Sequence, residues 1–269
     1  MPLPTKANIL GVGISVTNYA EVVEHVIAAA NERRSLLVSA CAVHVVMAAV
    51  DDPAFAAALN HFDIVAPDGQ PVRWGLSWTR QAKLRERVYG PTLMHEICQA
   101  AASAKLPIYL YGSRERTLQL LAARLPTLAK GLRIAGWRAG RFRPLSTAEQ
   151  ASDARAIAES GARIVFVGMG APRQEWWLFH MRERVQLPML AVGAAFDFHA
   201  GLLAQAPTIL QNAGLEWLFR LTREPARLWR RYLTVTPRYL PLIATQALGL
   251  REFAQNTALD AASKRPCPG

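Results

Sequence analysis

The chain has 269 residues, 51% of them hydrophobic, and its 31 Lys and Arg against 20 Asp and Glu give a formal net charge of +11. The length suits one large domain, or one domain with an appendage, and the excess of arginine favours anionic partners: lipid, nucleotide or nucleic acid. Three scattered cysteines, with no CxxC pair or His/Cys cluster, argue against a zinc site and favour a reducing, cytoplasmic compartment. The apolar run Tyr239–Leu250 is too short to span a bilayer.

In residues 1–211, apolar runs rich in strand-forming residues alternate with segments of helical spacing. The expected strands are Ile9–Val16, Leu36–Cys41, Ile64–Ala66, Ile108–Tyr111, Arg133–Trp137, Ile164–Val167 and Met189–Val192. The expected helices include Ala20–Asn31, Pro91–Ala104, Arg116–Leu125 and Thr147–Ser160. Asn18 is an expected N-cap, and Ser146 with Glu149 an expected capping box. The alternation predicts an α/β fold, with a Rossmann-like, mainly parallel sheet flanked by helices.

Residues 212–250 are expected to form a basic helical appendage. Within it, Leu215–Arg238 places six arginines among large aromatic and aliphatic side chains, against two acids. Glu224 and Pro225 predict a break into two helices, because the residue before proline avoids the α-helical region. The stretch is typical either of a surface that rests on anionic lipid or of solvated helices packed on the core. Residues 251–269 are expected to be a disordered tail.

Polar and glycine residues that follow the expected strands are the candidate site residues, because parallel sheets bind ligands at the carboxyl ends of their strands. They are Gly11, Gly13, Ser39, Cys41, His44, Asp68, Gly69, Gly112, Ser113, Gly168, Gly170, Arg173, Gln174, Glu175, Gly193 and Asp197. Asp68 is either a helix N-cap or a general base that takes a proton from an attacking hydroxyl. The turns at Gly112 and Gly170 either hold an anion at a helix N-terminus or are ordinary caps.

Two GxG sequences, Gly11-Val-Gly13 and Gly168-Met-Gly170, begin like a dinucleotide-binding fingerprint but lack its third glycine. A Rossmann-type NAD(P)-dependent oxidoreductase is therefore the alternative enzyme. A noncatalytic basic protein that binds membrane or nucleic acid is the alternative outside the enzymes. The chain has no DxD triplet, P-loop, GxSxG or HExxH motif. We therefore expect no metal and no cofactor, with arginines and helix dipoles neutralising any bound phosphate.

Together, these motifs resemble those of the WecG/TagA/CpsF family of bacterial glycosyltransferases (family 26 of the carbohydrate-active enzymes), from about Ile9 to Leu233. The strongest are VGMGAPRQE at 167–175, VGAAFDFHAG at 192–201 and GLEWLFRLTREPARLWRRY at 214–232. The resemblance implies a metal-independent, inverting transfer of a hexose or N-acetylhexosamine from a UDP-sugar to a polyprenyl-diphosphate-linked saccharide. The product would belong to a bacterial surface polysaccharide, such as exopolysaccharide or capsule.

The resemblance also implies partners and a location. The enzyme would be cytoplasmic and peripheral on the inner face of the cytoplasmic membrane. Its partners would be the UDP-sugar donor, the lipid-linked acceptor and the anionic membrane surface, and not nucleic acid. The oligomeric state stays open, with a homo-oligomer as one alternative.

Residue roles follow from the same resemblance. Asp68 matches the proposed catalytic base of a P/A-D-G motif, Arg87 a pocket arginine of an R-V-x-G motif, and Gln174 the glutamine of P-x-Q-E. Further substrate contacts are expected from Ser39, Cys41, Gly69, Gly112, Ser113, Gly170, Arg173, Glu175 and Asp197. In the appendage, Arg220, Arg227 and Arg230 match arginines that contact the membrane.

The chain departs from the family where T-x-N usually lines the pocket, because it has Ser39-Ala-Cys41 there. Ser39 keeps the hydroxyl, whereas Cys41 lacks an amide that both donates and accepts hydrogen bonds. A site built around such an amide discriminates among sugars by the hydrogen bonds that each sugar makes or fails to make with it. Another hexose is therefore an alternative to the usual N-acetylmannosamine-type donor.

Overall fold

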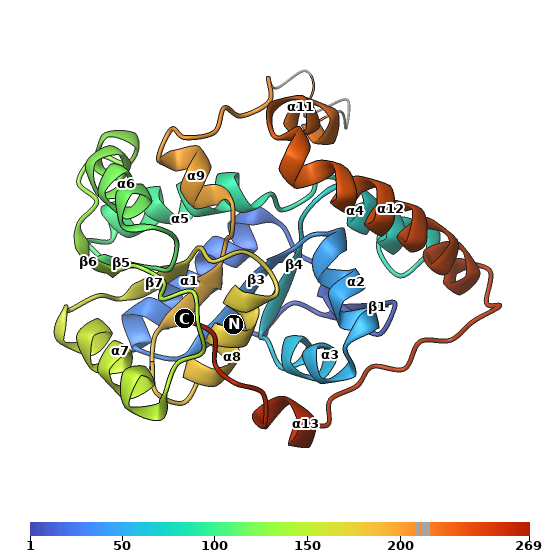
Figure 1. Ribbon diagram of the computed structural model, residues 1–269, viewed down its shortest axis with the longest axis horizontal. Coiled ribbons are helices and arrows are strands. Elements are labelled where there is room, and N and C mark those ends of the chain that lie inside the picture. Colours follow the sequence, from blue (N-terminus) through green and yellow to red (C-terminus); the bar gives the residue numbers. More distant parts are fainter. Residues whose placement is uncertain (208–209, 211–215) are drawn as a thin grey trace.

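The computed structural model describes residues 1–207, 210 and 216–269, apart from the side chains of residues 216, 227, 230 and 231. Its centre is a six-stranded sheet (Figure 1). The strands are β3 (Leu36–Cys41), β4 (Ile64–Pro67), β5 (Ile108–Tyr111), β6 (Ile134–Arg138), β7 (Ile164–Val167) and β8 (Pro188–Ala191). All neighbouring pairs are parallel, in the order β4-β3-β8-β7-β5-β6. The predicted α/β fold with a mainly parallel, Rossmann-like sheet is confirmed.

Two apolar clusters cover the two faces of the sheet. Ile164 and Phe166 of β7 belong to one cluster, and Val165 and Val167 belong to the other, because successive side chains of a strand point to opposite faces. The first face is covered by α1 (Tyr19–Glu32), α5 (Gly90–Ser103), α6 (Glu115–Leu128) and α9 (Ala195–His199). The second is covered by α2 (Val43–Asp51), α3 (Pro53–Asn60), α7 (Thr147–Glu159) and α8 (Arg173–Met181).

The predicted helix caps are present. The Asn18 side chain accepts a hydrogen bond from the Glu21 backbone N at the start of α1. Ser146 and Glu149 form the reciprocal capping box of α7. Both predictions are confirmed, since each cap satisfies backbone N–H groups that the first turn of a helix leaves unpaired.

The first expected strand is instead a hairpin of β1 (Lys6–Ile9) and β2 (Val12–Ser15), paired antiparallel. Leu10 and Gly11 both have positive φ, 52° and 85°, as a two-residue hairpin turn requires. The Asn8 side chain accepts from the Gly11 N at 2.9 Å and holds the turn. The expectation of one strand was therefore wrong. Its GxG belongs to a strand-to-strand turn and not to a dinucleotide fingerprint, which needs a helix after the strand.

The appendage consists of α11 (Glu216–Arg223) and α12 (Pro225–Ala247), so the predicted break at Glu224 is confirmed. The α12 helix packs on α2 and on α4 (Gln70–Trp78). Tyr239 is fully buried and donates to the Pro71 carbonyl at 3.0 Å. Arg238 pairs with Asp51 of α2 at 2.6 Å. Within the part of the chain that the structure describes, no helix is long and apolar enough to cross a membrane.

Residues 251–269 differ from the disorder that their composition predicts. This tail runs from α12 through α13 (Asp260–Ser263) and back to the centre of the molecule (Figure 1). The Asn60 side chain donates to the Asn256 carbonyl at 2.9 Å. The Leu145 N donates to the Cys267 carbonyl at 2.8 Å. These anchors lie far away in sequence, so the local composition of the tail gives no sign of them.

Candidate active site

A cavity of about 950 Å³ opens at the carboxyl edge of the sheet, between the core and the appendage. Its floor comes from the segments that follow β3, β4, β7 and β8, and its far wall comes from α11 and α12. The neighbouring strands β3 and β8 lead to helices on opposite faces of the sheet, α2 and α9, which leaves a crevice between the two connections. Ligands of open parallel sheets bind in such a crevice. The cavity is therefore the candidate active site.

Asp68 lines the cavity directly after β4. Its backbone N donates to the Cys41 carbonyl at 3.0 Å, which holds the loop against the end of β3. Gly69, at φ 88°, takes the N-cap position of α4, so Asp68 is not the N-cap residue of this helix. A Cβ added to Gly90 would lie 3.6 Å from Asp68 Oδ2. The glycine thus leaves room beside the carboxylate.

Arg87 also lines the cavity, and its guanidinium lies 4.5 Å from the centre of the Tyr89 ring. The Tyr89 N donates to the Tyr19 hydroxyl at 2.8 Å. The pKa of Tyr19 is raised to about 12, mainly by burial; the charge of Asp68 contributes to the rise and that of Arg87 opposes it. Tyr19 therefore lies near both charged groups. No motif indicates this, because Tyr19 begins a helix far from both motifs in the sequence.

Gln174 is a buried residue of the cavity floor. Its Oε1 accepts from the Gly170 N at 3.2 Å, and its Nε2 donates to Glu175 Oε1 at 2.9 Å. Glu175 Oε1 also accepts from the Ser39 hydroxyl at 3.1 Å. These bonds join the end of β3 to the start of α8. They fix the Gln174 amide at the cavity.

Ser39, Cys41 and Glu175 form a buried layer beneath this floor and do not line the cavity. Burial raises the pKa of Glu175, while hydrogen bonds from Gln174 and Ser39 oppose the shift. Burial raises the pKa of the Cys41 thiol, and the charges of Glu175 and Asp68 add to the effect. Cys41 thus lies within reach of the charges of both carboxyl groups, in the layer beneath the floor.

Four further expected substrate contacts lie outside the cavity. Gly112 and Ser113 follow β5, where a Cβ on Gly112 would clash with Met169 and the Ser113 carbonyl accepts from the Gly140 N at 3.0 Å. Arg173 is exposed and donates to the Met169 carbonyl at 3.0 Å. Asp197 lies in α9 and is not a lining residue. Gly69 and Gly170 do line the cavity, beside Asp68, Arg87 and Gln174.

The appendage wall of the cavity is aromatic and cationic. Arg220 lines it, with its guanidinium 5.4 Å from the centre of the Phe198 ring. Among the described residues, the buried Nε of Arg220 has no hydrogen-bond partner. Arg227 and Arg230 lie in α12, but their side chains fall outside the described part of the structure. Further lining residues are the core aromatics Trp74, Tyr89 and Phe198, to which the sequence assigned no role, and Trp217, Trp229 and Tyr232, the aromatics that alternate with the arginines of the appendage.

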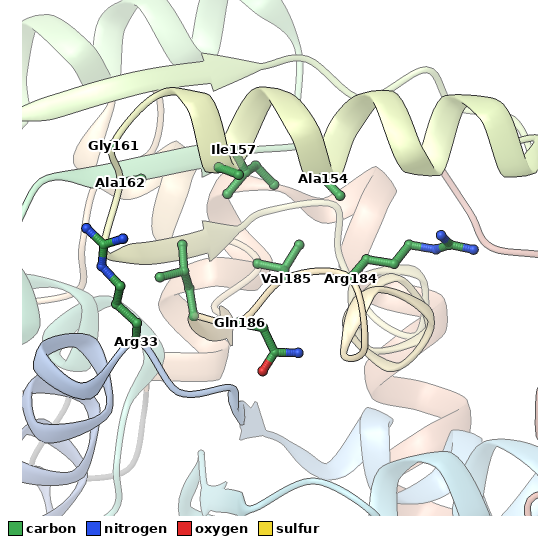
Figure 2. Close-up of a pocket in the computed structure, with 10 residues that line it drawn as sticks. Arg33, Ala154, Ile157, Gly161, Ala162, Arg184, Val185 and Gln186 are labelled. Atoms are coloured by element: carbon green, nitrogen blue, oxygen red, sulfur yellow. The ribbon is translucent and has the colours of Figure 1, made fainter.

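In the described ranges, no group of three or more His, Cys, Asp or Glu residues could hold a metal ion. A second pocket, of about 280 Å³, lies at the amino-terminal edge of the sheet. Figure 2 shows Arg33 and Arg184 on opposite sides of it, with Ile157 and Val185 between them. This pocket has no carboxylate, thiol or histidine in its lining, so it does not resemble a catalytic site.

Comparisons with known proteins point to a family of glycosyltransferases. The model of the "Glycosyl transferase WecG/TagA/CpsF family" matches residues 7–253. A Bacillus spizizenii protein is 30% identical over 196 residues, which cover 72% of this chain and 73% of that protein. A Bacillus subtilis (strain 168) protein is 26% identical over 255 residues, which cover 94% and 95%. Both are named N-acetylglucosaminyldiphosphoundecaprenol N-acetyl-beta-D-mannosaminyltransferase.

Proposed function

Since the chain belongs to the glycosyl transferase WecG/TagA/CpsF family and is a glycosyltransferase, we propose that it moves a hexose or N-acetylhexosamine from a UDP-sugar to a polyprenyl-diphosphate-linked saccharide. The transfer inverts the anomeric centre, needs no metal and serves a bacterial surface polysaccharide such as exopolysaccharide or capsule. The observation that carries the proposal is the cavity in which Asp68, Arg87 and Gln174 meet. The printed names of the two Bacillus relatives support a diphosphoundecaprenol-linked acceptor.

The proposed reaction is a single displacement. The Asp68 carboxylate takes the proton of an acceptor hydroxyl, and the hydroxyl oxygen attacks the anomeric carbon from the face opposite UDP. One C–O bond forms to the acceptor, and the C–O bond to the diphosphate breaks. UDP leaves with that electron pair. The proton remains on Asp68 until solvent removes it.

The departing diphosphate needs positive charge, because no metal is proposed to hold it. Arg87 lines the cavity together with Asp68, and Arg220 faces it from the appendage. The helices α4 and α5 begin at this cavity, and a helix N-terminus carries a partial positive charge. Fixed cations and dipoles of this kind stabilise charge that develops during a reaction. The N-terminus after Gly112 is not part of this arrangement.

The donor sugar depends on the layer beneath the floor. The Ser39 hydroxyl and Gln174 amide both bond to Glu175 Oε1, while Cys41 has no amide to offer. We therefore propose that the Ser39/Cys41 pair affects donor choice by setting the position of Gln174. An N-acetylmannosamine-type donor, which the names of the relatives support, and a plain hexose are the two donors to distinguish.

The decisive experiment measures UDP release with a panel of UDP-sugars and a short-chain lipid-diphosphate-N-acetylglucosamine acceptor. We expect one donor class to be used, with no requirement for a divalent metal. Asp68→Asn should lower kcat by about 10²–10⁴-fold, the usual contribution of a general base, with the melting temperature unchanged. Asp197→Asn is the matched control, because Asp197 lies outside the cavity. Near-normal turnover by Asp68→Asn would refute the base assignment.

The oxidoreductase alternative is tested in the same preparation. NADH fluorescence should not change on addition of the protein. A saturable change, together with no UDP release from any donor, would replace the transferase proposal. Vesicle binding without sugar transfer by the intact chain would instead favour the noncatalytic membrane-binding protein.

A further inference from the structure

The core helix α4 exposes a pair of tryptophans. Trp74 and Trp78 are one helical turn apart and therefore share a face. Their ring centroids are 6.3 Å apart with an angle of 20° between the rings. They are 42% and 45% exposed. Two stacked indoles held in solvent are a large apolar surface, and such surfaces mark contact sites for a partner or a membrane.

A neighbouring side of α4 is packed against the appendage. Gly75 lies against α12 so closely that a Cβ there would clash with Tyr239 Oη and lie 3.3 Å from Ile243 Cγ1. Tyr239 Oη also donates to the Pro71 carbonyl at 3.0 Å. The two helices therefore approach each other closely at Gly75, which has no side chain. The tryptophan pair is held beside α12. Trp229, Leu233 and Leu240 of α12 are 45%, 67% and 38% exposed, so both helices contribute to one apolar surface.

Positive charge adjoins the tryptophans. Arg80, Lys83 and Arg85 are exposed and follow α4 directly, and Glu86 is the single acid in residues 79–86. A cationic segment beside exposed indoles matches an anionic lipid surface, where the cations meet phosphates and the rings settle at the depth of the headgroups. A protein partner would need no such excess of one charge.

We propose that α4 is a second membrane-contacting element, located in the catalytic core, which places the Trp74–Trp78 pair in the headgroup region of an anionic bilayer next to the appendage. The inference rests on the proposed function, because a lipid-linked acceptor requires the cavity to meet the membrane. Trp74 and Leu233 both line the cavity mouth. Contact through α4 therefore brings that mouth to the headgroup level, where the diphosphate of the acceptor lies.

The test uses the full chain and sedimentation with phosphatidylcholine vesicles that either contain or lack phosphatidylglycerol. Trp78→Ser should weaken binding to the anionic vesicles by about tenfold, because it removes the burial of one half-exposed indole. Trp137→Ser is the matched control. Trp137 is 40% exposed, but it lies on β6 at the far edge of the sheet. Its replacement should leave binding unchanged.

Turnover separates a membrane effect from a damaged enzyme. Trp78 does not line the cavity, so Trp78→Ser should retain wild-type turnover with a short-chain, water-soluble acceptor and lose it with an acceptor embedded in vesicles. A second measurement, which does not depend on the serine variant, is the quenching of tryptophan fluorescence by brominated lipid. The intensity lost to quenching should fall in Trp78→Phe and stay constant in Trp137→Phe.

Three results would overturn the inference. Equal vesicle binding by the wild type and Trp78→Ser, with sugar transfer intact, would reject α4 as a contact and leave the proposed function standing. No vesicle binding by an active wild type would reject both the α4 contact and the membrane role of the appendage. A change of oligomeric state in Trp78→Ser, with vesicle binding unaltered, would assign the tryptophan pair to a protein interface.

Discussion

Glu175 is an acidic side chain in a place that disfavours charge. It is fully buried, and its Oε1 accepts two hydrogen bonds, from Ser39 and Gln174. Its Oε2 has no partner among the described residues. Because burial raises its pKa, the folded protein holds a proton on this carboxyl at pH values where the unfolded chain has lost it. Burial therefore favours the neutral form of Glu175 in the folded protein more than in the unfolded chain.

This arrangement predicts a pH dependence of stability. A folded-state pKa above the unfolded value contributes stability that is present below the unfolded pKa and is lost as pH rises through the folded pKa. Glu175→Gln removes this titration and keeps the shape, so its free energy of unfolding should exceed that of the wild type at neutral pH and converge with it in acid. Urea unfolding of the wild type and of Glu175→Gln across the pH range measures the two free energies. A wild-type advantage that grows with pH would contradict the prediction.

At the scale of single residues, the sequence predicted part of the site. Asp68, Gly69, Arg87, Gly170 and Gln174 do line one cavity. The rule that ligands follow parallel strands selects every strand end, but only the ends of β3, β4, β7 and β8 border the cavity. The turn after β5 satisfies the same sequence rule and lies outside the cavity. Tyr89 and Phe198 lie within quoted motifs but were assigned no role, since an aromatic ring in a sequence is most often a core residue.

The contact between α4 and α12 is, beside that of α12 with α2, a junction between core and appendage. It depends on one glycine, because Gly75 faces Tyr239 and Ile243 with no room for a side chain. Alanine is intrinsically favoured over glycine within a helix by about 1 kcal/mol. At this position packing and intrinsic helix preference therefore oppose each other, which allows their sizes to be compared.

We expect packing to dominate. Gly75→Ala should lower the free energy of unfolding by about 1–3 kcal/mol, as overpacking of a tight contact usually does. The double variant Gly75→Ala/Tyr239→Phe should recover part of this loss relative to the sum of the single variants, because the phenylalanine removes the oxygen that the new methyl group meets. Ser77→Ala, at an exposed position of the same helix, is the control. A stabilised Gly75→Ala would show that α12 does not pack here.

At the scale of elements, the sequence predicted the regular strands and helices but not the first hairpin or the packed tail. The strand at 36–41 and the helices near 19–32, 90–103 and 147–159 follow the predicted segments closely, because periodic apolar spacing reports burial directly. The first strand was misread because the turn at Leu10 and Gly11 lies inside an unbroken apolar run. The packed tail was missed because its anchors are single side chains, such as Asn60 and Asn8, on distant elements.

On the scale of the whole molecule, the appendage lines the cavity and is proposed to contact the membrane. Arg220 was expected to contact the membrane, yet it lines the cavity and lies over Phe198. Arg227 and Arg230 were matched to the same role, and their side chains lie outside the described residues. We therefore expect the three arginines to divide between chemistry and attachment.

The division is testable by comparing two variants. Arg220→Ala should lower kcat/KM with a short-chain soluble acceptor by about tenfold or more, since it removes a charge-assisted contact to phosphate. Arg227→Glu/Arg230→Glu should leave that value unchanged and release the protein from phosphatidylglycerol vesicles, in a salt-dependent way. Both quantities are measured for both variants. Normal turnover of the soluble acceptor by Arg220→Ala would instead favour the original expectation that Arg220 contacts the membrane.

The strand order has a consequence for how the chain acquires its structure. The last strand in sequence, β8, is not at an edge but between β3 and β7. Until residues 188–191 have left the ribosome, β3–β4 and β7–β5–β6 are two partial sheets, each with an open edge. Non-local, parallel pairing of this kind is slow, and unpaired edges invite association with other chains. The strand that completes the binding crevice is thus also the one that protects the nascent protein from aggregation.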